Sequence, residues 1–215
     1  LGLWQVAGEY FFEESSLTLA WLPFFNPDKQ PLPSSRWFVI DPAALGPQGS
    51  DFPFDRVEET FPENGLTQGL IRGKTTLKGW DLFAIVFHGY SYKPVYKMVD
   101  NSRINPARPV KYVKEYPEVL NISGGFSTAY KRFEIHGEGV YQHSLDGKDD
   151  SYLAYLIGFT APLDELAQFL GQERIELILE YGGEYIHKPQ DEPGYIRSSE
   201  DYRPIVNNIL MKTNF

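Results

Sequence analysis

The stretch FEIHGEGVYQ, residues 133–142, places two carboxylates and an imidazole on one side of an extended chain. Side chains of a strand alternate between its two faces, so Glu134, His136 and Glu138 share a face, while the other face is apolar and rich in glycine. Carboxylates and imidazoles bind metal ions, transfer protons or line water-filled paths. The strands around them decide which of these roles is possible.

Two specific chemistries are disfavoured by the spacing. Alternate Cβ atoms of a strand stand about 7 Å apart, which is wide for three ligands of one ion at bonds of about 2 Å, so we expect no metal at Glu134, His136 and Glu138. His143 and Ser144 have the residue types of a phospholipase base and nucleophile, but neighbours on a strand point to opposite faces. We therefore expect neither an enzyme nor a bound cofactor.

Composition narrows the class of protein. The chain has 215 residues, of which 42% are apolar and 15% aromatic, and a formal charge of −9. Nucleic-acid binding needs clustered Lys and Arg, so the acidic balance argues against it. No apolar run approaches the roughly 20 residues of a membrane-spanning helix, so any membrane role falls to strands. Cysteine is absent, which excludes disulfides. The chain starts at Leu1, and we expect it to be processed or part of a longer one.

Nine segments combine period-two alternation with aromatic and β-branched residues. They cover residues 3–12, 16–25, 65–74, 79–90, 118–127, 132–143, 151–160, 173–184 and 205–215. Most have about ten residues, the length of a tilted strand that crosses a bilayer (~9–11) rather than of a soluble strand (~5–6).

The connections between these segments alternate between short turns and long loops. The long loops are expected at residues 26–64, 91–117 and 185–204. The connection after the seventh segment is expected to hold two helical turns over residues 163–170, stopped by Gly171. Short turns at one rim and long loops at the other are typical of an up-and-down barrel in the outer membrane.

Alternation also assigns the polar side chains to one face of the expected sheet. An open sheet edge would leave backbone groups unpaired in hydrocarbon, so the strands are expected to close into a ring with this face inside. The expected lumen-lining residues are Glu9, Arg72, Lys74, Glu134, His136, Glu138, Glu176, Glu180, Glu184 and Lys212. Their acidic excess would favour cations or zwitterions in an open path, and an interior occluded by charge pairs is the alternative.

Aromatic residues gather near the expected strand ends, among them Tyr10, Tyr90, Tyr130 and Tyr185. Rings with a polar tip prefer the headgroup layer of a membrane, which predicts an aromatic girdle at each rim. Ordinary packing within a soluble sheet is the alternative, because aromatic residues are common in any strand.

Several stretches together resemble a known family. They are LWQVAGEYFFEESSLTLAWLPFFNPDKQPLPSSRW, GLIRGKTTLKGWDLFAIVFHGYSYKPV, FSTAYKRFEIHGEGVYQ, YLAYLIGFT and IELILEYGGEYI. These stretches look like successive hairpins of a poorly characterised, porin-like outer-membrane barrel family of Gram-negative bacteria, whose members are typically encoded near RND-type exporters and periplasmic lipid-handling proteins. The resemblance spans nearly the whole chain. It implies as partners outer-membrane lipid, a small-molecule or lipid-like solute, and periplasmic or RND-type export components.

We therefore expect one domain over residues 1–215, a transmembrane antiparallel up-and-down β-barrel in the bacterial outer membrane. Its expected role is a channel or export conduit for small or amphiphilic solutes. Single-chain bacterial barrels have an even number of strands, so nine strands predict that further strands complete the ring. The alternative is a soluble β-sandwich or jelly roll that binds carbohydrate through the aromatic residues Trp4, Trp21, Trp37 and Trp80.

Overall fold

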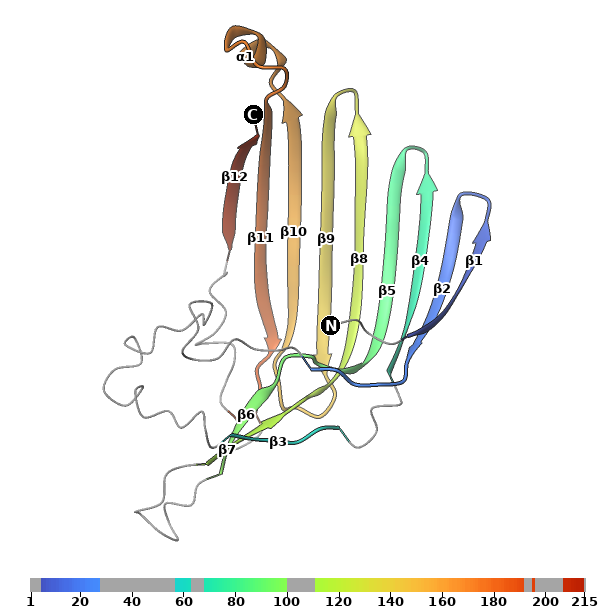
Figure 1. Ribbon diagram of the computed structural model, residues 1–215, viewed down its shortest axis with the longest axis vertical. Helices are drawn as coiled ribbons and strands as arrows, with labels where there is room; N and C mark the ends of the chain where they lie inside the picture. Colours follow the sequence, from blue (N-terminus) through green and yellow to red (C-terminus); the bar gives the residue numbers. More distant parts are fainter. Residues whose placement is uncertain are drawn as a thin grey trace, which may run out of the picture.

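A large antiparallel sheet dominates the computed structural model of the chain (Figure 1). The structure describes residues 5–27, 57–62, 68–99, 111–191, 195 and 207–214. The sheet has nine strands in the order β1-β2-β4-β5-β8-β9-β10-β11-β12. Their bounds are β1 Val6–Phe12, β2 Ser15–Leu22, β4 Gln68–Leu77, β5 Trp80–Tyr90, β8 Glu118–Tyr130, β9 Phe133–Ser144, β10 Ser151–Pro162, β11 Glu176–Lys188 and β12 Asn208–Asn214. The predicted all-β fold is confirmed, and each of the nine predicted segments forms one of these strands.

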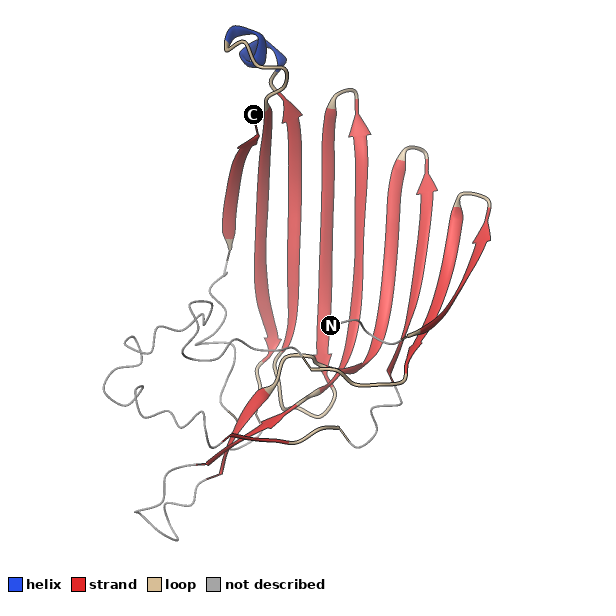
Figure 2. Ribbon diagram, viewed as in Figure 1, coloured by secondary structure: helices blue, strands red, loops and turns tan. Residues whose placement is uncertain are grey.

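Two-residue turns join three pairs of strands at one end of the sheet, which we call the short-turn end (Figure 2). They are formed by residues 13–14, 78–79 and 131–132. In the second turn Lys78 and Gly79 have φ values of 51° and 81°, as both central residues of a type I′ turn require. Such a turn matches the twist of the flanking strands, so the sequence fixes this hairpin locally.

The fourth hairpin, between β10 and β11, is closed by the helix α1 (Asp164–Phe169), within the predicted range 163–170. Gly171 has a φ of 67°, a left-handed conformation that commonly ends a helix, as the sequence predicted. Ala167 of the helix is 3% exposed, and Ile175 just before β11 is fully buried. The helix therefore packs onto the end of its own hairpin.

The opposite end of the large sheet, the long-loop end, carries a small sheet that the sequence did not predict. Its strands are β3 (Val57–Glu59), β6 (Val95–Val99) and β7 (Lys111–Glu115), in the order β3-β7-β6. These strands lie inside the predicted loops 26–64 and 91–117, so those segments contain regular structure. The third predicted loop also starts too early, because β11 continues to Lys188.

The large sheet is open, so the predicted closed ring is not present among the described strands. β1 and β12 form its two edges and do not pair with each other. Every pair of neighbours in the sheet is antiparallel, which makes the first and the ninth strand parallel. The two edges therefore cannot join directly as antiparallel neighbours.

Little of the described chain is buried, and its buried apolar residues lie near strand ends or in the small sheet. They are Leu22, Val95, Tyr116, Val119, Ala161, Ala167 and Ile175. Within the described ranges no second sheet covers the large one, as a β-sandwich requires. Trp21 and Trp80 lie on its apolar face, whereas Trp4 and Trp37 lie outside the described residues. No helix in the described part of the chain is long and apolar enough to cross a membrane.

Candidate functional site

Strand register places all ten predicted lumen residues on one face of the large sheet. Residues that pair directly across strands share a face, and one such row runs from Glu9 through Arg72 to Glu184. The other predicted residues lie in neighbouring rows on the same face of the sheet. We call this face the inner face. The ten residues are Glu9, Arg72, Lys74, Glu134, His136, Glu138, Glu176, Glu180, Glu184 and Lys212. Only three other charged residues occur in the nine strands: Asp81, also on the inner face, and Glu118 and Lys188 at strand ends.

His136 lies near the middle of the inner face. It pairs in register with Gly158 of β10, which in turn pairs with Glu180 of β11. A Cβ atom on Gly158 would lie 2.1 Å from Nε2 of His136, so the imidazole lies across the glycine. Nε2 of His136 is 3.4 Å from Oε1 of Glu180, and each side chain is 26% exposed. The glycine therefore lets the imidazole and the carboxylate approach each other although their strands are not neighbours.

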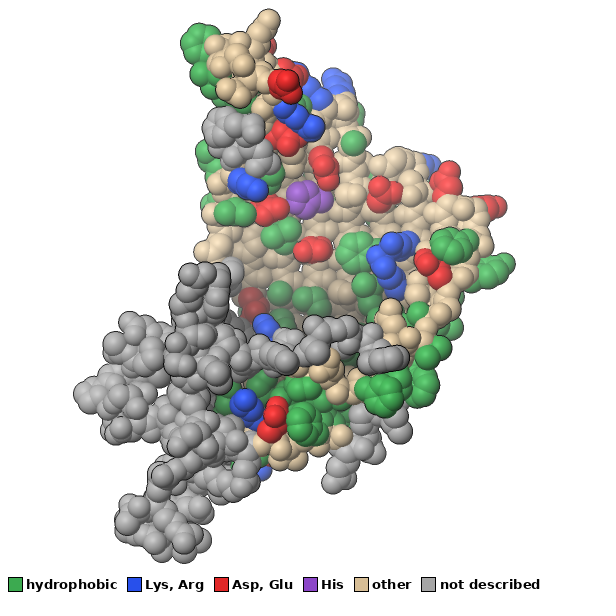
Figure 3. Space-filling view, in the orientation of Figure 1, with side chains coloured by type: hydrophobic (Ala, Val, Ile, Leu, Met, Phe, Trp, Pro, Cys, Tyr) green, Lys and Arg blue, Asp and Glu red, His purple; other side chains and the backbone are tan. Residues whose placement is uncertain are grey.

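His136 and Glu180 line a cleft of about 740 Å³ on the inner face. Figure 3 shows acidic and basic side chains together with a histidine on this side of the molecule. The charged lining of the cleft comprises six carboxylates and one lysine, namely Glu9, Glu13, Glu14, Asp81, Glu138, Glu180 and Lys74. Phe83 and Leu156 contribute apolar surface. A concave surface with an excess of one charge concentrates ions of the opposite sign. The cleft therefore suits a cation, or a molecule with a positive group and an apolar part.

Half of the predicted residues line this cleft: Glu9, Lys74, His136, Glu138 and Glu180. The others lie on the same face outside it: Arg72, Glu134, Glu176, Glu184 and Lys212. The Nε atom of Arg72 is buried and has no hydrogen-bond partner in the described structure. Leaving such a donor unpaired costs about 1–3 kcal/mol. Arg72 therefore carries one unsatisfied donor on a face where carboxylates outnumber basic side chains.

The sequence analysis missed Asp81, which accepts a hydrogen bond from Thr76 at 2.6 Å and lines the cleft. It also missed Phe83, whose ring covers Gly125 so closely that a Cβ atom there would lie 2.5 Å from it. Strand β5 is apolar on both faces, which hides its alternation. Counting in steps of two from Asp81 assigns both residues to the face of Lys74, with which Phe83 pairs.

The opposite face of the sheet, the outer face, is apolar between the strand ends. No Lys, Arg, Asp or Glu of the nine strands lies there apart from residues at strand ends. Its large side chains are uncovered, with Leu19, Ile71 and Ile157 54%, 51% and 51% exposed. Soluble monomers rarely expose contiguous apolar patches larger than a few hundred Å². An apolar face nine strands wide is therefore typical of a surface that contacts another protein or a membrane.

Aromatic side chains mark both ends of the outer face. Tyr10 and Phe12 stack with ring centroids 6.0 Å apart at the short-turn end, and Tyr130 there is 64% exposed. At the long-loop end, Tyr141 and Tyr185 lie in one row, because both pair in register with residue 153. Aromatic side chains therefore lie at both ends of this face, as the sequence predicted, whereas their position at the headgroup levels of a membrane stays a prediction.

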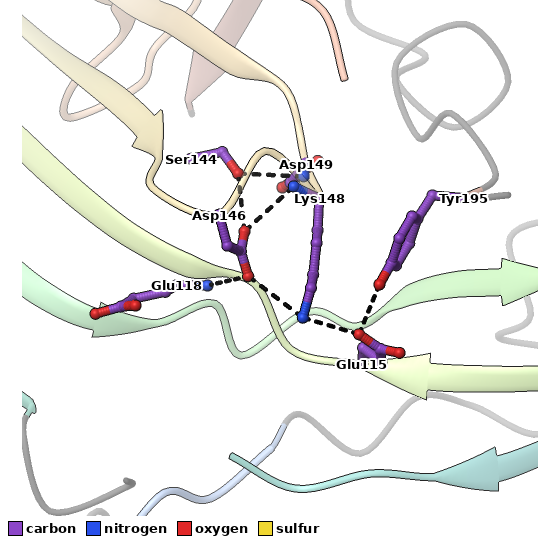
Figure 4. A network of polar contacts seen from close by, with 7 residues as sticks. All are labelled: Glu115, Glu118, Ser144, Asp146, Lys148, Asp149 and Tyr195. Carbon is purple, nitrogen blue, oxygen red and sulfur yellow. Dashed lines mark hydrogen bonds and ion pairs between the residues drawn. The ribbon is translucent and has the colours of Figure 1, made fainter. Parts of the chain in front are cut away.

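A polar network links the small sheet to the long-loop end of the large one (Figure 4). Nζ of Lys148, in the loop between β9 and β10, lies 2.9 Å from a carboxylate oxygen of Glu115 in β7 and 3.6 Å from Asp146. Tyr195 donates a hydrogen bond of 2.7 Å to the same carboxylate of Glu115. Asp146 accepts a hydrogen bond from the backbone N–H of Glu118, the first residue of β8. Lys148 therefore joins both sheets.

The network keeps its two main partners charged. Burial alone would raise the pKa of Glu115, but hydrogen bonds from Tyr195 and Lys148 outweigh it and hold the pKa below its ordinary value of 4.5. Burial would lower the pKa of Lys148, but its contacts with Glu115 and Asp146 raise it above its ordinary value of 10.5. The ion pair therefore persists throughout the neutral pH range.

No three His, Asp or Glu side chains in the described ranges gather around a point that could hold a metal ion. Glu134, His136 and Glu138 do share a face, but the imidazole turns away along the row towards Glu180. The structure therefore brings the histidine to a carboxylate two strands away instead of to its neighbours in sequence.

His143 does not pair with Ser144 in the structure. Its Nδ1 atom lies 3.2 Å from Oγ of Ser151, which also accepts a hydrogen bond from the backbone N–H of Ser144. Ser151 is 1% exposed. This part-buried contact joins β9 to β10.

Comparison with known proteins identifies no relative of this chain. No protein-family model matches it, no curated protein matches it, and no solved structure matches it. Its functional interpretation therefore depends on register, burial and charge.

Proposed function

We propose that this chain forms the wall of an outer-membrane β-barrel whose inner face lines an aqueous, acidic path for small or amphiphilic solutes. The outer face lies against lipid hydrocarbon in this proposal. Strands that pair with the edges of β1 and β12 complete the ring. The partners are outer-membrane lipid and the transported solute.

The sorting of charge between the two faces carries this proposal. Apart from Glu118 and Lys188, every charged residue of the nine strands lies on the inner face. A soluble antiparallel sheet with one wet face packs the other face on a core, but no described layer covers the outer face here. Lipid is the environment that tolerates a bare apolar face and excludes charge from it.

Strand length and the pattern of turns give further support. Strands β4 and β5 have 10 and 11 residues, and β8 to β11 have 12 or 13. A strand needs about 9–11 residues to cross a bilayer at a tilt. Short turns at one end and longer segments at the other match the periplasmic and external rims of outer-membrane barrels.

The charge of the inner face defines the solutes that fit the path. Seven carboxylates oppose three basic side chains, namely Glu9, Asp81, Glu134, Glu138, Glu176, Glu180 and Glu184 against Arg72, Lys74 and Lys212. This excess favours cations and the positive groups of zwitterions or amphiphiles. The apolar patches of Phe83 and Leu156 in the cleft suit the apolar part of an amphiphile.

Two measurements on the purified chain test the proposal. In the first, the chain is purified with and without detergent and its migration is compared on a mildly denaturing gel before and after heating. The proposal expects a detergent requirement and heat-modifiable migration. A monodisperse protein in plain buffer with unchanged migration would overturn it and favour the soluble carbohydrate-binding alternative.

The second measurement is the reversal potential across a planar lipid bilayer under a salt gradient. An acidic path shifts the reversal potential towards that of the cation. A chain that enters the bilayer but shows no conductance, or shows anion preference, would overturn the proposed path while leaving the membrane location intact.

A further inference from the structure

Three basic residues, His143, His187 and Lys188, lie close together in register at the long-loop end of the outer face, and we call them the basic rim cluster. They come from β9 and β11, on either side of β10. His143 contacts Ser151, which pairs in register with Lys188. The ring of Tyr141 stacks on His143 with centroids 6.4 Å apart and also contacts His187 edge-on at 6.4 Å. One tyrosine ring therefore lies between two imidazoles.

A local irregularity brings two of these residues to the same rim. Ser151 pairs with Lys188, but the next residue of β10, Tyr152, pairs with Ile186, so His187 is an extra residue on β11. Such a bulge interrupts the alternation of side chains along a strand. His187 can then contact Tyr141 while its neighbour Lys188 stays paired with Ser151. Both side chains are exposed.

The basic rim cluster contrasts with the rest of the outer face, where the described strands carry no other Lys or Arg. Two carboxylates lie near this end of the sheet. Glu118 lies 3.0 Å from His88, which belongs to the same row as His143. Asp150, next to Ser151, is fully buried; its Oδ1 atom accepts a hydrogen bond from the backbone N–H of Gln190, and its Oδ2 atom has no hydrogen-bond partner in the described structure.

The other titratable groups facing the cluster are the imidazole of His88, in the same row as His143, and phenols. Tyr141 belongs to β9 and Tyr185 to β11, and no carboxylate of β9, β10 or β11 lies on this side of the sheet. When the histidines are protonated, the cluster therefore carries positive charge that no neighbouring acid on these strands cancels.

We infer that the basic rim cluster binds the phosphate of lipid headgroups in the leaflet at the long-loop end. This inference rests on the proposed function, because it needs the outer face to lie in a membrane. The tyrosines Tyr141 and Tyr185 place this rim at headgroup level, where amphipathic rings prefer to lie. Basic side chains at that level attract anionic lipid, and histidine changes its charge between about pH 5 and pH 8. Binding should therefore strengthen as the pH falls.

The test measures which lipids surround the reconstituted chain. The full chain is inserted into phosphatidylcholine vesicles that contain spin-labelled phosphatidylglycerol or spin-labelled phosphatidylcholine, and the motionally restricted fraction of each is compared at about pH 5.5 and pH 8. One added charge near an anionic headgroup favours binding by about fivefold. The phosphodiester of phosphatidylglycerol keeps one negative charge at both pH values, so the preference for this lipid should rise several-fold at the lower pH.

Matched variants locate the effect. His187→Gln removes one imidazole that makes no hydrogen bond in the described structure, so its folding should be unaffected and its pH response should be smaller. His143→Gln combined with His187→Gln should reduce the pH response further, and Lys188→Gln should lower the preference at both pH values. His136→Gln, on the inner face, should keep the lipid preference of the parent chain.

The outcomes separate the inference from the proposed function. A chain that does not enter vesicles and needs no detergent refutes both. A chain that inserts and shows heat-modifiable migration, but prefers phosphatidylglycerol at neither pH, refutes the cluster alone. The same conclusion follows if the double variant keeps the full pH response of the parent chain or if His136→Gln removes it.

Discussion

Replacing Ile157 with lysine separates a lipid-facing sheet from a soluble one. Ile157 lies in the middle of β10 on the outer face, where it pairs with Gly137 and Tyr181. No carboxylate lies at these paired positions to receive the new charge. The expected result of Ile157→Lys therefore depends almost entirely on whether lipid or water covers this face.

Water and lipid at the outer face predict different changes in the free energy of unfolding for Ile157→Lys. Ile157 is 51% exposed, so in water the ammonium group would remain solvated and change the free energy of unfolding by at most about 0.5 kcal/mol. At the midplane of a bilayer, lysine on the lipid face of a barrel costs about 2–4 kcal/mol. At about 1.4 kcal/mol for each factor of ten, the folding equilibrium constant should fall roughly 30- to 700-fold.

The assay is a denaturant titration of the chain in lipid vesicles, followed by tryptophan fluorescence. Thr160→Lys is the matched control, because Thr160 lies three residues further along the same strand on the inner face and pairs with Glu134. This variant should change the free energy of unfolding by less than about 1 kcal/mol. If Ile157→Lys and Thr160→Lys have equal small effects, the outer face does not contact lipid and the transport proposal fails with it.

Three further predictions concern the acidic path, the junction between the two sheets and the helix α1. Glu138→Gln with Glu180→Gln should lower the cation-to-anion permeability ratio roughly two- to tenfold in planar bilayers, because both carboxylates line the cleft, whereas Ser123→Ala outside it should not. Lys148→Met should destabilise the junction of the two sheets by about 1–3 kcal/mol at neutral pH. The stabilisation of the folded state by Glu115 is present above the ordinary pKa of 4.5 and is lost as the pH falls through the lower pKa that Glu115 has in the folded chain. The stabilisation by Lys148 is present below its ordinary pKa of 10.5 and is lost as the pH rises through its raised pKa in the folded chain. The rate of proteolysis of the parent chain should therefore increase at low and at high pH, and it should depend less on pH in Lys148→Met. Identical pH dependence in the two proteins would contradict the role of the Lys148–Glu115 pair. Ile175→Ala should lower the free energy of unfolding by about 2–5 kcal/mol, measured by thermal or denaturant unfolding, because Ile175 is fully buried. Arg132→Ala should lower it by at most about 1 kcal/mol, because the ion pair of Arg132 with Asp164 is exposed. Equal losses in the two variants would refute the packing of α1.

Alternation was sufficient to predict the nine strands of the large sheet and the face of each predicted inner residue. Local chemistry explains this success, because each hairpin is fixed by its own turn and by its own apolar side. The same reasoning could not find β3, β6 and β7. These strands have five residues or fewer, and β3 pairs with β7 across more than fifty residues of sequence, so their pairing is set by tertiary contacts.

The candidate site was predictable in composition but not in geometry. Period two placed His136 and Glu180 on one face, but only the register between strands shows that Gly158 lies between them and lets them meet. The basic rim cluster was hidden for a related reason. It depends on a bulge in β11, and a pattern count that assumes strict alternation assigns His187 and Lys188 to opposite faces.

The two edges of the sheet constrain how it can exist in a membrane. β1 and β12 have seven residues each, and each pairs on one side only. An unpaired backbone group in hydrocarbon costs several kcal/mol, so both edges need a partner strand. Because both strands run in the same direction, joining them directly gives a parallel pair, and so does joining them to the edges of a second copy in the same membrane orientation. A wholly antiparallel ring therefore requires an odd number of additional strands, which gives the even total of bacterial single-chain barrels.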